Sequence, residues 1–238
     1  MKKLLALAAL VSLSIGVKAQ NPVGKFSLRP MAGVNISTLA NGEFDIYKTK
    51  VGFTGGLEME YGVNRWLGAS AGLVYSQQGA KVDGALSMLY NEEQYMYYTI
   101  TKMNGKLKCD YLNIPVMANI YIPSIKGLAI KAGVQLGILV NDQISLETIT
   151  VVDREFQSQS PEILSNDGYP IVTSQYTTQS DICKSVDFGI PVGLSYEYKN
   201  ITLDARYYFG LTKIDKTENP DNARNRYLSI TLGYRFGL

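Results

Sequence analysis

The stretch that most constrains the fold is 110–122, DYLNIPVMANIYI, in which apolar residues fill every second position from Leu112 to Ile122. Side chains on a β-strand point alternately to opposite faces, so this period-two pattern predicts a strand with two unlike faces. In a soluble protein the apolar face would contact a core and the other face would contact water. Which medium each face meets here depends on the rest of the chain.

Eight segments show the same alternation, and we predict strands at 26–36, 51–61, 66–78, 110–122, 128–138, 183–198, 201–209 and 228–236. Short turns alternate with long connections, which cover 37–50, 79–106, 141–182 and 212–225. An even number of strands with short turns at one end and long loops at the other is typical of outer-membrane barrels. Each strand also reaches the ~9–11 residues that a tilted membrane strand needs. The sequence therefore predicts an all-β fold, an eight-stranded antiparallel transmembrane β-barrel with four long external loops and short periplasmic turns.

The start of the chain has the order of a secretory signal peptide. A basic MKK precedes a short apolar run and a small-residue cleavage pattern that ends at Ala19. We predict that 1–19 is cleaved and that 20–238 forms the barrel domain in the cell outer membrane. The alternative is an uncleaved anchor, although the run is shorter than the ~20 apolar residues of a spanning helix. Removal of the three lysines in this segment lowers the formal net charge from +2 to −1, so we expect no nucleic-acid partner.

The face opposite the apolar one carries charges of both signs. The interior of an eight-stranded barrel is only wide enough to be filled by side chains, and strands in lipid must leave no open edge. We therefore predict that the apolar face contacts outer-membrane lipid and that the charges pair in a lumen ionic network. Its predicted members are Arg29 and Arg235 with Glu58 and Glu60, Lys131 and Arg206 with Asp187 and Glu197, and Asp204 on the same face.

Aromatic residues gather at the short-turn ends of the predicted strands. Amphipathic rings favour the headgroup level of a membrane, so we predict an interfacial girdle. Aromatic residues are enriched in strands of every kind, which is the alternative explanation. The predicted girdle consists of Phe26, Tyr61, Trp66, Tyr196, Tyr198 and Phe236.

The two cysteines, Cys109 and Cys183, fall at inward positions near the long-loop ends of their strands. One strand lies between theirs, so regular backbones would hold them ~9–10 Å apart. A disulfide needs Cα atoms within about 7 Å, and the export route permits disulfides. The sequence leaves both a Cys109–Cys183 disulfide and two separate buried thiols open.

The chain contains no His, the most common general base in enzymes. Glu58 and Glu60 lie two apart on one face, as an acid/base pair would, but pairing with Arg29 and Arg235 is the simpler interpretation. Two Cys without His cannot supply a structural zinc site. We therefore predict a protein that is not an enzyme, with no catalytic residue, no cofactor and no metal.

The long connections carry any recognition. Segment 141–182 has seven acidic residues against one Arg. Its alternating stretches ISLETITVV and PIVTSQYTT predict a hairpin that continues above the membrane. Asn104-Gly105 predicts a tight turn within the preceding connection. We expect these segments to bind an extracellular ligand or a protein partner.

The stretches DYLNIPVMANIYI, VDFGIPVGLSYEY and ITLDARYYFGLTKI resemble the PorT-like outer-membrane β-barrel family. The family's Tyr-Leu-x-Ile-Pro and Arg-Tyr-x-x-Gly-Leu-x-x-Ile motifs stand here at 111–115 and 206–214. The resemblance covers about 24–238 and implies the barrel fold. Some relatives assist protein secretion across the outer membrane, so the resemblance also implies secretion components as partners. These motifs specify strand positions rather than chemistry.

The last residues, TLGYRFGL, are similar to the terminal-strand signal read by the barrel-assembly machinery, except that Leu238 replaces the usual aromatic residue. A last strand with alternating faces would give the same pattern. Two functions remain for the barrel. The first is a non-enzymatic interaction or secretion-accessory protein that acts through its external loops or rim, and the second is a narrow channel or small-solute porter. A soluble secreted barrel is the alternative at the level of the fold.

Overall fold

The computed structural model describes residues 23–40, 46–92, 95–155, 171–216 and 223–238. The predicted signal peptide, 1–19, lies outside them. Among the described residues, no helix is long and apolar enough to cross a membrane.

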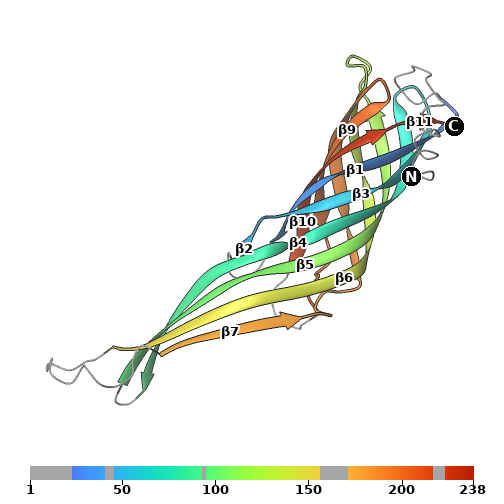
Figure 1. Cartoon of the computed structure of the whole chain (residues 1–238). Helices are drawn as coiled ribbons and strands as arrows, with labels where there is room; N and C mark the ends of the chain where they lie inside the picture. The colour runs from blue at the N-terminus through green and yellow to red at the C-terminus, as the bar shows by residue number, and fades with distance from the viewer. Residues whose placement is uncertain (1–22, 41–45, 93–94, 156–170, 217–222) are drawn as a thin grey trace, which may run out of the picture.

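Eight strands form a closed ring in which each pairs antiparallel with the next (Figure 1). In ring order they are β1 (Phe26–Ala40), β3 (Lys50–Gly62), β4 (Leu67–Glu92), β5 (Tyr95–Tyr121), β6 (Leu128–Glu155), β8 (Val186–Tyr198), β9 (Ile201–Gly210) and β10 (Arg224–Tyr234). The pairing of β10 with β1 closes the ring. Three shorter strands join it, β2 (Tyr47–Lys48) on β4, β7 (Ile171–Gln179) on β6 and β11 (Phe236–Gly237) on β1. The predicted eight-stranded antiparallel barrel is confirmed.

Alternation along β5 shows which medium each face meets. Ile114, Val116 and Ile120 point outward and are 36%, 52% and 42% exposed, whereas Asn113 and Asn119 point inward and are buried. Because lipid offers no hydrogen bonds, the apolar side chains can face it only when every backbone group is paired within the sheet. The closed ring meets that condition.

Two of the four predicted long loops, 79–106 and 141–182, are mostly strand. β4 and β5 pair from the barrel as far as Glu92 and Tyr95, and β6 continues beside them to Glu155. The predicted hairpin within 141–182 is present as β6 and β7, with Val151 opposite Val172. We call the part of β4, β5, β6 and β7 beyond the barrel the extension. It projects far from the ring, away from β11 (Figure 1).

The predicted turn at Asn104-Gly105 is wrong. Both residues lie inside β5, where Asn104 is opposite Glu147 and Gly105 is opposite Leu146. A Cβ at Gly105 would lie 2.2 Å from the Ser145 carbonyl oxygen, so the glycine serves a close approach of two strands instead of a turn.

The predicted girdle residues lie on the outside of the ring at its short-turn end. Phe26 and Tyr61 are opposite each other on β1 and β3, with ring centroids 4.9 Å apart. Trp66, Tyr196 and Tyr198 are each about half exposed, at 51%, 47% and 60%. A girdle of these rings at the headgroup level stays a prediction.

Closure of the ring depends on the glycine where β1 meets β10. A Cβ on Gly33 would lie 2.0 Å from the Ile230 carbonyl oxygen, whereas a Cβ on Gly237 would meet nothing within 4 Å. We expect Gly33→Ala to destabilise the barrel by about 1–3 kcal/mol through overpacking, and Gly237→Ala to leave it unchanged. The measurement is the folded fraction on unheated gels across a urea series. Equal midpoints for the two variants would contradict this account of closure.

Candidate functional site

Five charged side chains form a central cluster across the lumen. Lys131 Nζ lies 2.8 Å from Asp204 Oδ2 and 3.1 Å from Glu58 Oε1. Arg206 contacts the same two carboxylates at 2.6 Å each, and Arg29 pairs with them from β1. Lys131 is on β6, four places around the ring from β1 and therefore opposite it. The pairs thus cross the lumen and block it.

A second cluster lies nearer the short turns. Arg235 Nε donates to Glu197 Oε2 at 2.6 Å and Nη2 donates to Glu60 Oε2 at 3.2 Å. The Tyr121 hydroxyl donates to Glu60 and accepts from Arg235 at 2.9 Å. The central cluster holds three cations and two carboxylates, and the second holds one cation and two carboxylates. The excess charges have opposite sign, so the two clusters together are neutral.

Asp187 is separate from both clusters. It accepts hydrogen bonds from Thr212 Oγ1 at 2.5 Å and Asn225 Nδ2 at 2.9 Å. The predicted pairing of Asp187 with Lys131 is wrong, because in the β6–β8 register Lys131 is opposite Gly193 and Asp187 is opposite Gly137. Strand tilt therefore moves Asp187 toward the extension. The polar partners Tyr121, Thr212 and Asn225 were not predicted, although alternation already placed Tyr121 on the inward face.

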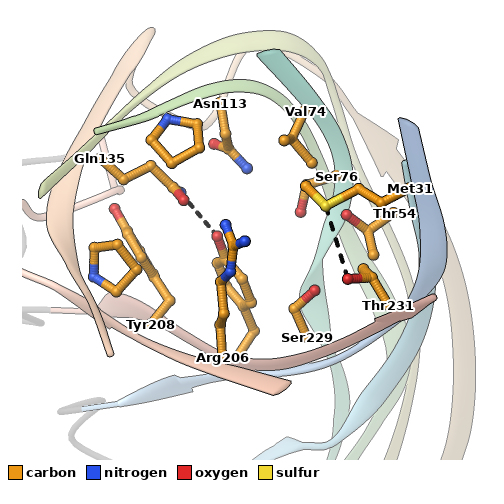
Figure 2. A pocket seen from close by; sticks show the side chains of 13 residues that line it. Met31, Thr54, Val74, Ser76, Asn113, Gln135, Arg206, Tyr208, Ser229 and Thr231 are labelled. Atoms are coloured by element: carbon orange, nitrogen blue, oxygen red, sulfur yellow. Dashed lines mark hydrogen bonds between the residues drawn. The ribbon is translucent and has the colours of Figure 1, made fainter. Parts of the chain in front are cut away.

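A small cavity of about 30 Å³ lies in the lumen between Asp187 and the central cluster. Figure 2 shows polar side chains such as Asn113, Ser76 and Gln135 converging on it from several strands. The Gln135 amide donates to the Tyr227 hydroxyl at 2.8 Å. This volume suits about one or two waters, and does not suit a solute path.

The two faces of the strands exchange character where the extension begins. Within the barrel the outward face is apolar, but in the extension it carries exposed Lys81, Asp83, Lys102, Lys106 and Lys108. Such charges are costly against lipid, so this level marks the external membrane boundary. The inward positions change in the opposite sense and become apolar. We call them the inner face, which includes Val82, Leu86, Met88, Met103, Leu107, Ile144 and Leu146.

A β-bulge in β6 turns its apolar side chains to the inner face of the extension. The register with β5 shifts because Tyr111 is opposite Leu139 whereas Asp110 is opposite Asn141, which leaves Val140 as an extra residue. A one-residue slip turns every later side chain to the other face of a sheet. Without the bulge, Ile144 would point outward, so the bulge places it on the inner face.

The inner face ends at the barrel mouth in a buried apolar cluster. Its members are Leu39, Ala80, Leu107, Cys109, Tyr111, Cys183, Ile214 and Ala223. A cavity of about 270 Å³ lies above it, lined mostly by apolar side chains of the inner face together with Cys183 and Ile214.

The Asp142 side chain holds residues 181–183, which cross the end of the barrel where the extension begins (the mouth). Its carboxylate accepts the backbone N–H groups of Asp181 at 3.0 Å and of Ile182 and Cys183 at 2.7 Å each. Desolvation by burial favours the neutral acid, but these three donors outweigh it and lower the pKa of Asp142 below its ordinary value. In the sequence, Asp142 is one of the seven acidic residues of 141–182, and its alternation with neighbours predicts no such role.

The possible chemistry of these groups is limited. The part of the chain that the structure describes contains no group of three or more His, Cys, Asp or Glu residues placed to bind a metal ion. Glu58 and Glu60 contact different arginines and lie 2% and 4% exposed. The arrangement in the lumen pairs and buries the charge of these two carboxylates.

The family of the outer membrane protein beta-barrel domain matches residues 18–216. The chain belongs to this family. Together with the lipid-facing ring, the match identifies an integral protein of the outer membrane. No curated protein matches the chain.

Solved barrels give a weaker likeness. Ail, the attachment invasion locus protein of Yersinia pestis, is 16% identical over 90% of this chain and 100% of its own, with a TM-score of 0.41. Neisserial surface protein A is 14% identical over 91% and 100%, with a TM-score of 0.40. OprG from Pseudomonas aeruginosa is 11% identical over 92% and 99%, with a TM-score of 0.37. The family match, and not these structures, assigns the chain.

The charge balance of the central cluster predicts that loss of a carboxylate destabilises this outer-membrane barrel more than loss of a cation does. Glu58→Gln removes a carboxylate from a cluster that already has one extra cation, and we expect it to cost about 3–5 kcal/mol. Lys131→Met removes the extra cation, and we expect a cost below about 2 kcal/mol. Urea midpoints in detergent, read from unheated gels, measure both. A larger loss for Lys131→Met would contradict the assigned balance.

Asp142 gives a local prediction. Asp142→Asn should speed amide exchange at 181–183 at neutral pH, because a carboxylate accepts these bonds more strongly than an amide. Asp83→Asn, at an exposed outward position, is the matched control. Because the folded pKa is lowered, the protection should be present above the unfolded value of about 3.9 and be lost as pH falls through the folded pKa. Equal amide protection at 181–183 in the wild type and in Asp142→Asn would contradict the assigned hydrogen bonds to the Asp142 carboxylate.

Proposed function

We propose that this protein is a non-enzymatic outer-membrane interaction protein that works through its extension, above a lumen that stays closed. The observation that carries the proposal is the exchange of faces at the membrane boundary. A sheet in water ordinarily covers its apolar face, and an exposed apolar patch marks an interaction site. Here Met88 on the inner face is 52% exposed.

The edge strand of the extension, β7, favours a partner that pairs with it as an additional strand. Among the described residues, β7 pairs with β6 alone. It contains no Lys, Pro or other residue that would discourage pairing at an edge, and Val172 and Tyr176 are 62% and 74% exposed. Backbone hydrogen bonds along such an edge give affinity, and alternate side chains give specificity.

The chemistry of the two surfaces defines the partner. β7 carries no charge, and the inner face is built mostly of aliphatic, Met and Thr side chains, with Gln175 and Gln179 of β7 on the same side. The partner is therefore an extended, uncharged polypeptide segment whose apolar side chains cover the inner face. A role as a secretion accessory is one specific form of this function, and the resemblance to the PorT-like family favours it. Assembly would begin with recognition of the last strand by the barrel-assembly machinery.

A photo-crosslinking residue at Thr173, on the inner-face side of β7, tests the proposal in intact cells. We expect one reproducible protein adduct whose cross-linked peptide is extended and uncharged. The double variant Leu86→Lys and Leu146→Lys should lower its yield by at least about tenfold, as loss of a buried apolar anchor does. The matched control is Asp83→Lys, on the outward face.

The identity and response of the adduct decide between outcomes. A secretion component at Thr173 would support the accessory role, and another extended segment would support interaction in general. No adduct, or an adduct with lipid alone, would contradict the proposal, as would equal yields in the inner-face variant and its control.

The alternative function, a narrow channel or small-solute porter, makes a different prediction. The charged pairs that cross the lumen, and the small cavity of about 30 Å³ next to them, support a closed lumen. The folded protein should therefore add no unit conductance to a planar bilayer. Folding of the same preparation is checked by its mobility on unheated gels. A reproducible unit conductance would contradict the closed lumen and favour the channel.

A further inference from the structure

The two cysteines meet at the floor of the cavity above the barrel. The Sγ atoms of Cys109 and Cys183 lie 2.8 Å apart, although 74 positions separate the residues in the chain. Both side chains are buried, with exposures of 0% and 2%. Two regular strands with a third between them would not bring these residues together.

The segment before β8 accounts for the contact. Asp142 on β6 binds the N–H groups of 181–183 and draws the segment across the mouth. Cys183 then forms an isolated bridge with Asp215, and the Lys184 N–H donates to the Ile214 carbonyl at 2.7 Å. Cys183 therefore lies inside the mouth instead of on a strand of the wall. Cys109 reaches it from β5.

The geometry points to a disulfide between Cys109 and Cys183 in the mature protein. The sulfurs are within about 1 Å of the bonded distance of ~2.05 Å. An outer-membrane protein passes through the periplasm, where disulfides form and persist. No other cysteine in the chain competes for either partner. This inference does not rest on the proposed function.

The oxidant is a disulfide carried by a dithiol oxidase of the cell envelope. The thiolate of one cysteine attacks that disulfide, forms a mixed disulfide and expels one thiol of the donor. The thiolate of the second cysteine then attacks the mixed disulfide, which forms the Cys109–Cys183 bond and releases the donor as a dithiol. Two electrons and two protons pass from the cysteines to the donor and its surroundings.

Burial fixes when this exchange can take place. In the closed mouth neither sulfur is accessible to a protein donor. The hydrogen bond to Cys183, with burial, also raises the pKa of the Cys109 thiol, so the reactive thiolate is disfavoured there. Oxidation therefore precedes closure of the mouth, and the finished bond is shielded from reductants.

The bond would tie the extension to the barrel mouth at the boundary between two unlike compartments. Below it lie the polar lumen and Asp187, and above it lies the apolar cavity of about 270 Å³. The covalent link joins β5 to the segment before β8, which the Asp142 carboxylate already holds to β6 at this level. It thereby fixes the floor of the cavity.

Thiol counting on the full-length protein tests the inference directly. Protein in isolated outer membranes is quenched in acid, denatured in SDS and treated with a maleimide that adds visible mass per thiol. We expect no adduct before reduction and two adducts after it. Cys109→Ser and Cys183→Ser should each take one adduct without reduction, and these variants calibrate the gel even if their mouths do not close.

Two results would overturn the inference. Two adducts on the wild type without reduction would show separate thiols. A reductant-sensitive dimer would show that the cysteines pair between chains. A mass for the unreduced monomer lower by two hydrogens than for the reduced one, together with a linked peptide pair, would complete the positive result.

Discussion

The structure depends on one constraint, that a backbone in lipid must pair all of its hydrogen-bonding groups within the protein. A ring of eight strands satisfies it, and the ring in turn fixes the width of the lumen. Charges that enter so narrow a space lose most of their water and must find partners there. The neutral sum of the two lumen clusters follows from this requirement. Filling of the lumen is thus a consequence of closing a small ring.

Beyond the membrane boundary the same strands continue, but the chemistry of their two faces is reversed. Outward positions take on lysines such as Lys81 and Lys106, while inward positions become apolar. Three features lie together at this level: the bulge at Val140, the carboxylate of Asp142, and the contact between Cys109 of β5 and Cys183 of the segment before β8. The mouth therefore separates the polar, filled lumen from the apolar inner face of the extension.

Much of the barrel could be predicted from the sequence, because alternation in a strand such as 110–122 depends only on the medium at each face. The hairpin of β6 and β7 could also be predicted, from the alternation within 141–182. The continuation of β4 and β5 into the extension could not, because Asn104-Gly105 and nearby lysines favour turns locally. Pairing on both sides of β5 outweighs that preference. Regular strand spacing also could not place Cys183, which lies in a segment that the Asp142 carboxylate draws across the mouth. The displacement of Asp187 from Lys131 follows from a register that sequence periodicity does not define.

The central claim is that the apolar inner face stands outside the membrane, above a closed barrel. Single tryptophans in a Trp66→Phe background test it, because the chain has one Trp. Leu136→Trp lies on the outward face of β6 within the barrel, and Leu146→Trp lies on the inner face of the extension. In vesicles of brominated lipid, the account predicts quenching of the first tryptophan by lipid, and quenching of the second only by an aqueous ion such as iodide. Quenching of the tryptophan at 146 by brominated lipid would place the inner face in the bilayer and contradict the account.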